Sequence, residues 1–404
     1  MARFLALIAM FIALPAFAAD WPQFLGPNRD SASTEKVSAW TEDPKVLWKA
    51  PLGESHSSPV VVNGVVYAFF KPKGKDADAL TAFDAKSGEK LWDQHYDRAK
   101  FTPPFGAGPR GTPCVEDNRI YTVGSTGILA CWNGTSGNVE WKVDTLKEFN
   151  GKNLLFGVST SPTVIGDLVI VMVGAKGAGI VAFNKTSGKV VWKTTDDPAS
   201  YATPLPIGQG EKQQLVFLTG SHLRSLSPTG KELWAVPFKD RLNESSTTPV
   251  QVGDMIVASS VTAGSLAVTP GEGEPKQVWK DDKLTCYFST PVVSGDDLYM
   301  INGVPSLTNA SITLRCVEAK TGKVRWSKEK IGKYHAAIIK VADGNLLMLD
   351  DTGNLILIKP NPKEYIELAR SKVCGETWAH PALSDGRLFV RDDKELIALD
   401  VSGK

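Results

Sequence analysis

The chain has little of what enzymes and metal proteins usually need. Its 404 residues include only five cysteines and five histidines, and they contain no HExxH, Walker, GxSxG or zinc-spaced Cys/His motif. An excess of one charge is also lacking, because 45 basic and 44 acidic residues leave a formal net charge of +1. Nucleic-acid binders usually carry a basic excess on some face. We therefore expect no catalytic residue, no metal ligand and no nucleic-acid partner.

The cysteines are scattered as well as few. They stand singly at Cys114, Cys131, Cys286, Cys316 and Cys374, and none forms a CxxC pair. An odd number in an exported chain leaves at least one free thiol. Cys131 and Cys316 occupy a repeat position that holds alanine or serine in the sister repeats, so we interpret them as small buried side chains.

A long apolar run occurs only at the N-terminus. The segment "MARFLALIAMFIALPAFA" has one arginine, then apolar residues, and it ends in the small-x-small sequence Ala16-Phe17-Ala18. This pattern predicts a secretory signal peptide over residues 1–18, with an uncleaved anchor as the alternative. No cysteine stands at the cleavage position, so we expect no lipid anchor. The sequence predicts a periplasmic or secreted protein without a membrane anchor.

The chain repeats itself. The eleven residues "AFDAKSGEKLW" begin at Ala82, and similar segments begin at Cys131, Ala182 and Cys316. Each copy has apolar residues, then a polar turn that Asp, Asn or Glu opens and Gly closes, then a short strand ending in Trp. This order predicts a β-hairpin.

A second hairpin precedes these. The segment "SSPVVVNGVVYAF", from Ser57, joins two strands rich in β-branched and aromatic residues through an Asn-Gly turn. A marker proline recurs in seven units, and Ala337 takes the remaining place; the prolines are Pro59, Pro113, Pro162, Pro204, Pro249, Pro291 and Pro381. Eight units of four short strands predict a β-propeller, with a stacked solenoid as the alternative.

The two ends of the repeat array complement each other. The last unit stops after its third strand, at "ELIALDVSGK", and "KVLWKA" (residues 45–50) is a fourth strand without a unit. Pairing that strand into the last unit would leave no unpaired edge in the ring. We therefore predict an all-β fold, a single eight-bladed β-propeller over residues 45–404. Residues 19–44 would form an N-terminal strap across one face.

Seven of the eleven tryptophans share one repeat position. We predict that they end the fourth strands and cover the seams between blades, each burying on the order of 200 Å². A ligand would not need one tryptophan per repeat, so we interpret them as structural. They are Trp48, Trp92, Trp141, Trp192, Trp234, Trp279 and Trp326.

One repeat position varies where the others repeat. It lies three residues before each marker, in loops that meet at one end of a propeller channel, and such loops often carry function. We predict a ligand-binding site at this mouth, with stacking aromatic rings and the charge of Arg110; the alternative is a packed plug. The predicted residues are His56, Arg110, Tyr201, Glu244, Phe288, Tyr334, His335, Trp378 and His380. The loop over residues 93–111 would be a lid or a plain surface loop.

The segments "SSPVVVNGVVY" and "LTAFDAKSGEKLW" resemble the repeat of the pyrroloquinoline quinone (PQQ) propeller superfamily. That group contains quinoprotein alcohol and glucose-type dehydrogenases and also non-enzymatic propellers such as the outer-membrane assembly lipoprotein. The resemblance covers residues 45–404. The segments "WPQFLGPNRD" and "KVCGETWAHPALSDGRLFVRDDKELIALD" are also similar to the ends of a secreted subgroup of PQQ-like repeat proteins.

The resemblance implies the propeller fold and two candidate functions. One is an exported, non-enzymatic scaffold, expected to be a monomer, that binds a protein partner or a small ligand at its loop face. The other is a PQQ-dependent oxidoreductase acting on alcohols or sugars, with PQQ and calcium at the channel mouth. The alcohol dehydrogenases of the group use two adjacent cysteines, a calcium site and a catalytic aspartate. This chain has no adjacent cysteines, which favours the scaffold.

Overall fold

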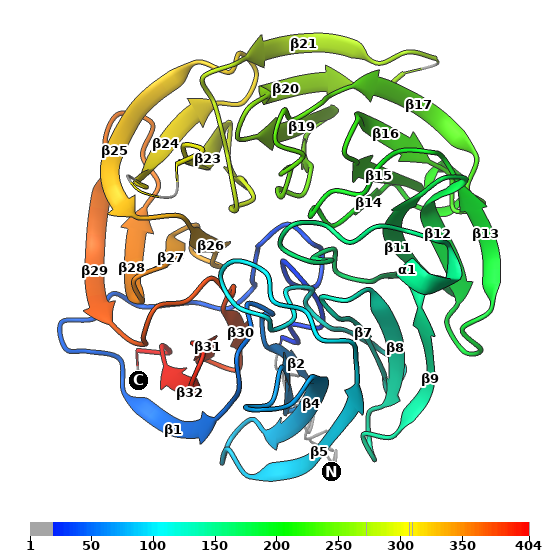
Figure 1. The fold of residues 1–404 in the computed structure, drawn as a ribbon. Helices are drawn as coiled ribbons and strands as arrows, with labels where there is room; N and C mark the ends of the chain where they lie inside the picture. Colours follow the sequence, from blue (N-terminus) through cyan, green and yellow to red (C-terminus); the bar gives the residue numbers. More distant parts are fainter. Residues whose placement is uncertain (1–18, 272, 307, 309, 404) are drawn as a thin grey trace, which may run out of the picture.

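The protein is an eight-bladed ring of antiparallel sheets. The computed structural model describes residues 19–271, 273–306, 308 and 310–403, and the predicted signal peptide, residues 1–18, lies outside them. Within these described ranges, thirty-two strands form eight four-stranded sheets, arranged as blades around a central channel (Figure 1). The predicted all-β, eight-bladed propeller is confirmed.

The first four blades follow the chain from the channel outward. Blade 1 consists of β2 (Val60–Val62), β3 (Val65–Phe70), β4 (Ala77–Asp84) and β5 (Lys90–Asp97). Blade 2 consists of β6 (Cys114–Glu116), β7 (Arg119–Val123), β8 (Ile128–Asn133) and β9 (Val139–Asp144). Blade 3 consists of β10 (Thr163–Ile165), β11 (Leu168–Ala175), β12 (Ala178–Asn184) and β13 (Val190–Thr194). Blade 4 consists of β14 (Leu205–Ile207), β15 (Gln214–Leu218), β16 (His222–Leu226) and β17 (Glu232–Pro237).

The next three blades repeat the pattern. Blade 5 consists of β18 (Val250–Val252), β19 (Met255–Ser260), β20 (Gly264–Thr269) and β21 (Lys276–Asp281). Blade 6 consists of β22 (Val292–Ser294), β23 (Asp297–Asn302), β24 (Ile312–Glu318) and β25 (Val324–Gly332). Blade 7 consists of β26 (Ala336–Lys340), β27 (Leu346–Asp350), β28 (Asn354–Lys359) and β29 (Ile366–Lys372). The described residues contain two short helical turns, α1 (Thr145–Glu148) and the 3₁₀ turn Gly210–Lys212.

Blade 8 joins the two ends of the chain. It contains β30 (Ala382–Ser384), β31 (Arg387–Arg391) and β32 (Glu395–Asp400), and its outer strand is β1 (Val46–Pro51). β1 runs antiparallel to β32, with Trp48 opposite Ala398 and Ala50 opposite Leu396 (Figure 1). The predicted closing strand, residues 45–50, is therefore confirmed to within one residue.

The repeated turns explain the repeated tryptophans. At six seams the indole N–H of one blade donates a hydrogen bond to a backbone carbonyl in the turn of the next blade. The pairs are Trp48–Ala85, Trp92–Gly134, Trp141–Lys185, Trp192–Pro228, Trp279–Ala319 and Trp326–Asn361, at 2.7–3.1 Å. Trp234 differs, since its indole N–H donates to the Gln214 side chain of its own blade. The interpretation as structural docking residues is therefore confirmed for six of the seven tryptophans.

The prediction that these tryptophans end the fourth strands is wrong. Trp92 is the third residue of β5, which continues to Asp97, and Trp326 is the third residue of β25, which continues to Gly332. Most residues beyond Trp92 and Trp326 are exposed and charged or polar, so the apolar pattern ends before the strand does. The predicted loop over residues 93–111 is accordingly shorter and begins after Asp97.

A second set of contacts links the blades around the channel. The backbone N–H just before or at the start of an inner strand donates to a serine or threonine hydroxyl of a neighbouring blade, at 3.0–3.3 Å. The pairs are Ser58–Thr112, Thr112–Ser161, Ser161–Thr203, Thr248–Thr290, Ala336–Ser289 and His380–Ser58. These hydroxyls explain why Ser or Thr precedes most of the marker prolines, since a buried backbone donor needs an acceptor.

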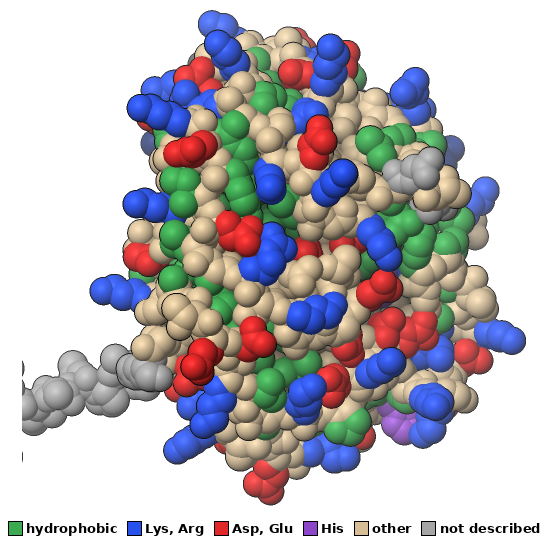
Figure 2. Space-filling view, turned by 90° about the vertical axis from the view of Figure 1, so that its left-hand side faces the viewer, with side chains coloured by type: hydrophobic (Ala, Val, Ile, Leu, Met, Phe, Trp, Pro, Cys, Tyr) green, Lys and Arg blue, Asp and Glu red, His purple; other side chains and the backbone are tan. Residues whose placement is uncertain are grey.

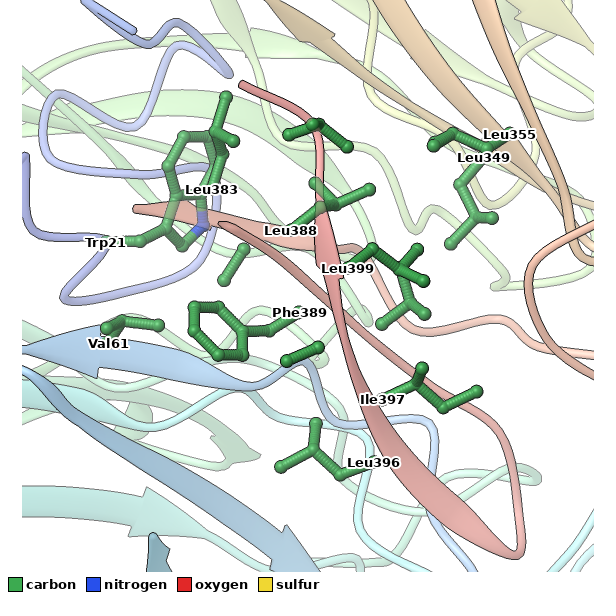
Figure 3. Packing of buried hydrophobic residues seen from close by; sticks show 14 of the residues in the cluster. Trp21, Val61, Leu349, Leu355, Leu383, Leu388, Phe389, Leu396, Ile397 and Leu399 are labelled. Atoms are coloured by element: carbon green, nitrogen blue, oxygen red, sulfur yellow. The ribbon is translucent and has the colours of Figure 1, made fainter. Parts of the chain in front are cut away.

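The N-terminal strap packs against blades 1, 7 and 8. Trp21 exchanges two backbone hydrogen bonds with Val61 and lies in the hydrophobic cluster shared by blades 7, 8 and 1 (Figure 3). Further along, the Trp40 indole N–H donates to the Ser371 hydroxyl of β29 at 2.8 Å. The Glu35 carboxylate accepts the backbone N–H groups of Asp385 and Gly386 in blade 8.

The outer surface is mixed in charge, and the cysteines are inside. Figure 2 shows lysine, arginine and acidic side chains interspersed over one side of the rim. All five cysteines are buried and free. Among the described residues, no helix has the length and apolarity needed to span a bilayer.

Candidate functional site

The loops that enter the inner strands enclose a cavity of about 110 Å³ at the channel mouth. Seven of the nine predicted site residues line it: His56, Arg110, Tyr201, Phe288, His335, Trp378 and His380. Tyr334 lies beside it, in a neighbouring groove that also borders His56 and Trp378. The ring closure thus brings together residues that are more than 300 positions apart in the chain.

Trp378 is at the centre of an aromatic cluster. Its ring centroid lies 5.1 Å from that of Phe105, 5.1 Å from that of Phe288 and 5.4 Å from that of Tyr334. The His56 ring stands edge-on to it at 5.1 Å. Such tilted and edge-to-face pairs favour a fixed arrangement of rings. Trp378 and its neighbours Phe105, Phe288 and Tyr334 are all partly exposed, so this arrangement is accessible from outside.

Phe105 reaches the cluster from the loop between β5 and β6, which Figure 1 shows over the central opening. Its backbone φ of 59° is in the left-handed region, which a bulky side chain rarely adopts. Glu54 holds the next part of the loop, because its carboxylate accepts the Ala107 N–H at 2.7 Å. The loop therefore covers part of the channel mouth, and we call residues 98–111 the lid loop.

A buried ion pair anchors this loop to blade 1. The Arg98 Nε donates to Asp78 Oδ1 of β4 at 2.8 Å, and both side chains are fully buried. Arg98 Nη2 donates to the Ala107 carbonyl at 2.7 Å, which connects the ion pair to the loop. Arg98 is therefore one of several residues, with Glu54 and Arg110, that hold the loop carrying Phe105.

Arg110 contacts its own loop. Its guanidinium donates to the backbone carbonyls of Pro104, Phe105, Gly106 and Gly108 at 3.0–3.4 Å. Burial lowers the pKa of Arg110 to about 10, so the group stays charged at neutral pH. The prediction that Arg110 supplies charge to a ligand is untested, and in this arrangement the same charge stabilises the lid loop.

Glu244 and Tyr201 lie just outside the aromatic cluster. The Glu244 carboxylate accepts a hydrogen bond from the Tyr287 hydroxyl, and the Tyr287 ring stacks on Phe288 at 3.7 Å. Glu244 does not line the cavity, so it supports Phe288 indirectly. The Tyr201 hydroxyl accepts the Phe156 N–H at 3.3 Å, and burial raises the pKa of Tyr201 to about 12.

Three cavity residues carry no repeat signal and were missed by sequence reasoning. They are Phe24 of the strap, Phe105, and Phe156 of the loop after α1. Phe24 stands edge-on to His380 at 4.9 Å, and Phe156 lies 5.6 Å from Tyr201. They sit in segments without the repeat pattern, so only their aromatic character in long loops could have suggested them.

Three histidines in the channel are held in the neutral form. Burial and the nearby Arg110 lower the pKa of His56 to about 3, and burial lowers the pKa of His335 to about 4. Burial and His335 lower the pKa of His380 well below its usual value. The His335 and His380 rings are 5.0 Å apart. Protonation of one would place a charge in a dry site beside the other.

We expect His380→Phe to weaken the acid sensitivity of the fold. The unfolded chain protonates His380 below about pH 6.5 while the folded chain does not, so its contribution to stability is complete above that pH and falls with acidification. Between pH 7 and pH 5 this loss is about 2 kcal/mol. Thermal unfolding at both pH values should show a smaller drop for His380→Phe than for wild type.

Replacing the exposed His95 by phenylalanine is the control and should leave the drop unchanged. Asp351 and Glu244, whose pKa values burial raises, act in the opposite direction. They are present in every variant and cancel in the comparison. Equal drops for wild type and His380→Phe would contradict a neutral, buried His380.

The cavity at the mouth does not fit PQQ with calcium. PQQ is a tricyclic tricarboxylate, whereas the mutual ring contacts of Trp378, Phe105 and Phe288 leave only about 110 Å³. Arg110, the one cationic side chain of the cavity lining, is occupied by four carbonyls of its own loop. The cavity lining contains no carboxylate or thiol. Within the described part of the chain, no three His, Cys, Asp or Glu side chains gather as a metal site.

The fold and the mouth define a PQQ-like repeat propeller: eight blades, a closing N-terminal strand and indole docking at the seams. The chain belongs to the family described as outer membrane protein assembly factor BamB, whose repeats match residues 31–98, 75–328 and 309–404. This confirms the resemblance to the PQQ-like repeat.

Three relatives illustrate the similarity. An outer membrane protein assembly factor BamB from Shewanella oneidensis is 21% identical over 375 residues, which is 86% of each chain. The crystal structure of BamB from Moraxella catarrhalis has a TM-score of 0.63 at 15% identity, covering 89% of this chain and all of that one. Quinohemoprotein alcohol dehydrogenase from Comamonas testosteroni has a TM-score of 0.63 at 12% identity, covering 96% of this chain and 81% of that one. At these identities, the two structures establish the fold alone.

Proposed function

We propose that this protein is an exported, non-enzymatic propeller scaffold that binds a protein partner through the loop face at its channel mouth. The observation that carries the proposal is the aromatic cluster of Trp378, Phe105, Phe288 and Tyr334, which is fixed by mutual contacts and partly exposed. Rigid aromatic anchors with an arginine nearby are typical of binding hot spots.

The size of the cavity favours a protein over a small ligand. Small-molecule sites usually enclose several hundred Å³ and bury most of the ligand, whereas this cavity measures about 110 Å³. A protein partner can contact the rings and the lid loop from outside without entering the channel. The name of the BamB relatives, outer membrane protein assembly factor, also supports a protein-binding role in the cell envelope. Export rests on the predicted signal peptide.

The test places a photo-reactive phenylalanine analogue at Phe105, in cells of the native host. We expect one discrete protein adduct after irradiation, identified by mass spectrometry. The matched control is the same analogue at Val191, which is 54% exposed on the rim strand β13, and it should not give that adduct. The partner, once purified, should bind the double variant Phe105→Ala/Trp378→Ala at least about 30-fold more weakly.

Two outcomes would overturn the proposal. One is an adduct that forms from the rim position and not from the mouth. The other is saturable binding of PQQ with calcium, followed by tryptophan fluorescence and lost in Trp378→Ala, together with dye-linked turnover of an alcohol or sugar. The second outcome would establish the oxidoreductase instead.

A further inference from the structure

An open groove lies at the seam between blades 1 and 2. Its volume is about 640 Å³, and it shares no lining residue with the mouth cavity. Leu91 in its wall is 50% exposed, although its side chain is large and apolar. The other apolar or aromatic side chains of the lining are Val62, Val65, Tyr67, Trp92 and Val115. We call this groove the seam groove.

The next seam, between blades 2 and 3, is closed by a lysine. The Lys185 amine crosses that seam and pairs with Glu116 at 3.0 Å and with Asp117 at 3.2 Å. Gly134 holds the same repeat position in blade 2, since its carbonyl accepts the indole N–H of the preceding blade as the Lys185 carbonyl does. Gly134 has no side chain to place over the seam between blades 1 and 2, so the seam groove stays open.

A tyrosine hydroxyl in the seam groove lacks the partner that its equivalents have. Tyr121 and Tyr299 hold the repeat position of Tyr67 in blades 2 and 6. The Tyr121 hydroxyl donates to the Lys185 carbonyl at 3.2 Å, and the Tyr299 hydroxyl accepts the Asn361 N–H at 3.0 Å. Tyr67 is only 6% exposed, lines the groove and forms no hydrogen bond with any other described residue. Because burial raises the pKa of Tyr67, its hydroxyl remains a neutral donor.

The corresponding seam between blades 7 and 8 is filled by an extended segment of the chain itself, residues 33–38 of the strap. The Glu35 carbonyl accepts the Ala342 N–H of blade 7 at 2.8 Å, and the Glu35 carboxylate accepts the Gly386 N–H of blade 8 at 2.6 Å. Two residues further on, Val37 is 1% exposed within the hydrophobic cluster of these blades. The fold therefore accommodates an extended peptide at such a seam, with hydrogen bonds to both blades and an apolar side chain inside.

The seam groove offers similar contacts. The blade 2 turn Asp117–Asn118 has φ values of 49° and 59°, close to the 53° and 67° of the blade 8 turn Asp385–Gly386, whose two N–H groups Glu35 accepts. The backbone N–H groups of the blade 2 turn donate to no other described residue. An extended segment in the seam groove therefore has donors in the turn, as Glu35 has in blade 8, and a further donor in the Tyr67 hydroxyl.

We propose that the seam groove binds an extended segment of a partner protein that presents a bulky, neutral apolar side chain. That side chain contacts Leu91 and Trp92, and a backbone carbonyl of the segment accepts the Tyr67 hydroxyl. The two carboxylates of the lining are already paired with Lys185, which favours a neutral side chain over a basic one. Hydrogen bonds to the main chain and pockets for its side chains are a common way to recognise extended peptides. The site is independent of the function proposed for the mouth.

The experiment selects binders from a phage-displayed library of short random peptides. The immobilised protein is the Phe105→Ala/Trp378→Ala variant, so that the aromatic cluster of the mouth does not contribute. We expect the selected peptides to share a bulky apolar residue and to bind the wild type equally well in fluorescence anisotropy. Replacing that residue of the peptide by serine should weaken binding at least about tenfold.

Leu91→Lys should weaken the selected peptides at least about tenfold, because it places a charge in the apolar wall. Leu233→Lys is the matched control and should leave their affinity unchanged. Leu233 precedes Trp234 in blade 4 as Leu91 precedes Trp92 in blade 1, and it is 41% exposed. Since both leucines are exposed, we expect both variants to fold.

Tyr67→Phe tests the hydroxyl separately. It should weaken the selected peptides about fivefold and leave the Tm of the free protein unchanged. Tyr121→Phe should lower the Tm, because it loses the bond to the Lys185 carbonyl. The proposal is overturned if no selected peptide depends on Leu91, or if Leu233→Lys weakens binding as much as Leu91→Lys does. Unchanged peptide affinity in Tyr67→Phe would equally exclude the proposed contact.

Discussion

Replacing Arg98 by methionine should cost about 4 kcal/mol of unfolding free energy. The change leaves the Asp78 carboxylate fully buried with only a 3.4 Å contact to the Tyr96 hydroxyl. Burial already raises the pKa of Asp78 although Arg98 opposes this, so the carboxylate is poorly solvated even in the pair. Urea denaturation of the variant and the wild type measures the cost.

Two controls separate the buried charge from other effects. Lys49→Met breaks an ion pair of similar length, 2.8 Å to Glu395, whose side chains are exposed or partly exposed, and it should cost less than about 1 kcal/mol. The double variant Arg98→Met/Asp78→Leu removes both charges and should recover most of the loss. A cost for Arg98→Met no larger than that of Lys49→Met would contradict the prediction.

Loss of Arg98 should also release the lid. Arg98 holds the Ala107 carbonyl, two residues after Phe105. In the single variant we expect faster proteolysis within residues 98–111 under native conditions. An unchanged cleavage rate there would mean that Glu54 and Arg110 hold the loop without Arg98.

Replacing Gly88 by alanine should cost about 3 kcal/mol, more than the same change at Gly64. Both glycines close turns of blade 1 with nearly equal φ values, 75° and 74°. A methyl group at Gly88 would stand 2.6 Å from the Trp48 indole, whereas nothing lies within 4 Å of one at Gly64. Gly64→Ala therefore measures the cost of the left-handed backbone alone, about 1 kcal/mol.

The difference between the two glycine variants measures the docking of blade 8 on blade 1. Trp48 has little freedom to move away, since its indole N–H is bonded to the Ala85 carbonyl at 3.1 Å. Denaturant midpoints of both variants give the comparison. Equal losses of stability would show that Trp48 can shift at little cost and that this seam is looser than its geometry indicates.

The number of blades could be predicted from the sequence because every blade repeats the same pattern of residues along the chain. Asn133 and Asn184 cap equivalent turns by accepting backbone N–H groups two and three residues ahead, and each turn glycine faces the tryptophan of the preceding blade. Each such choice is local, so it can be recognised from neighbours in the chain. The missing last strand and the extra first strand likewise revealed the closure.

The sequence also located most of the mouth, and for the same reason. Equivalent repeat positions of different blades meet at the channel when the ring closes. In four blades this position holds His56, Tyr201, Phe288 and Trp378. The length of the outer strands was misjudged, because beyond Trp92 only Tyr96 is buried, and the exposed Asp93, His95 and Asp97 carry no apolar pattern.

What the sequence determined by itself is the periodic part of this protein: eight blades, their closure and the ring of variable residues. The tertiary structure alone decided the rest, including the loop that places Phe105 over the mouth, the entry of Phe24 into the channel, and the surroundings that keep three histidines neutral. These features depend on contacts between segments far apart in the chain. Their burial and hydrogen bonds exist only once the ring has closed, so no local pattern records them.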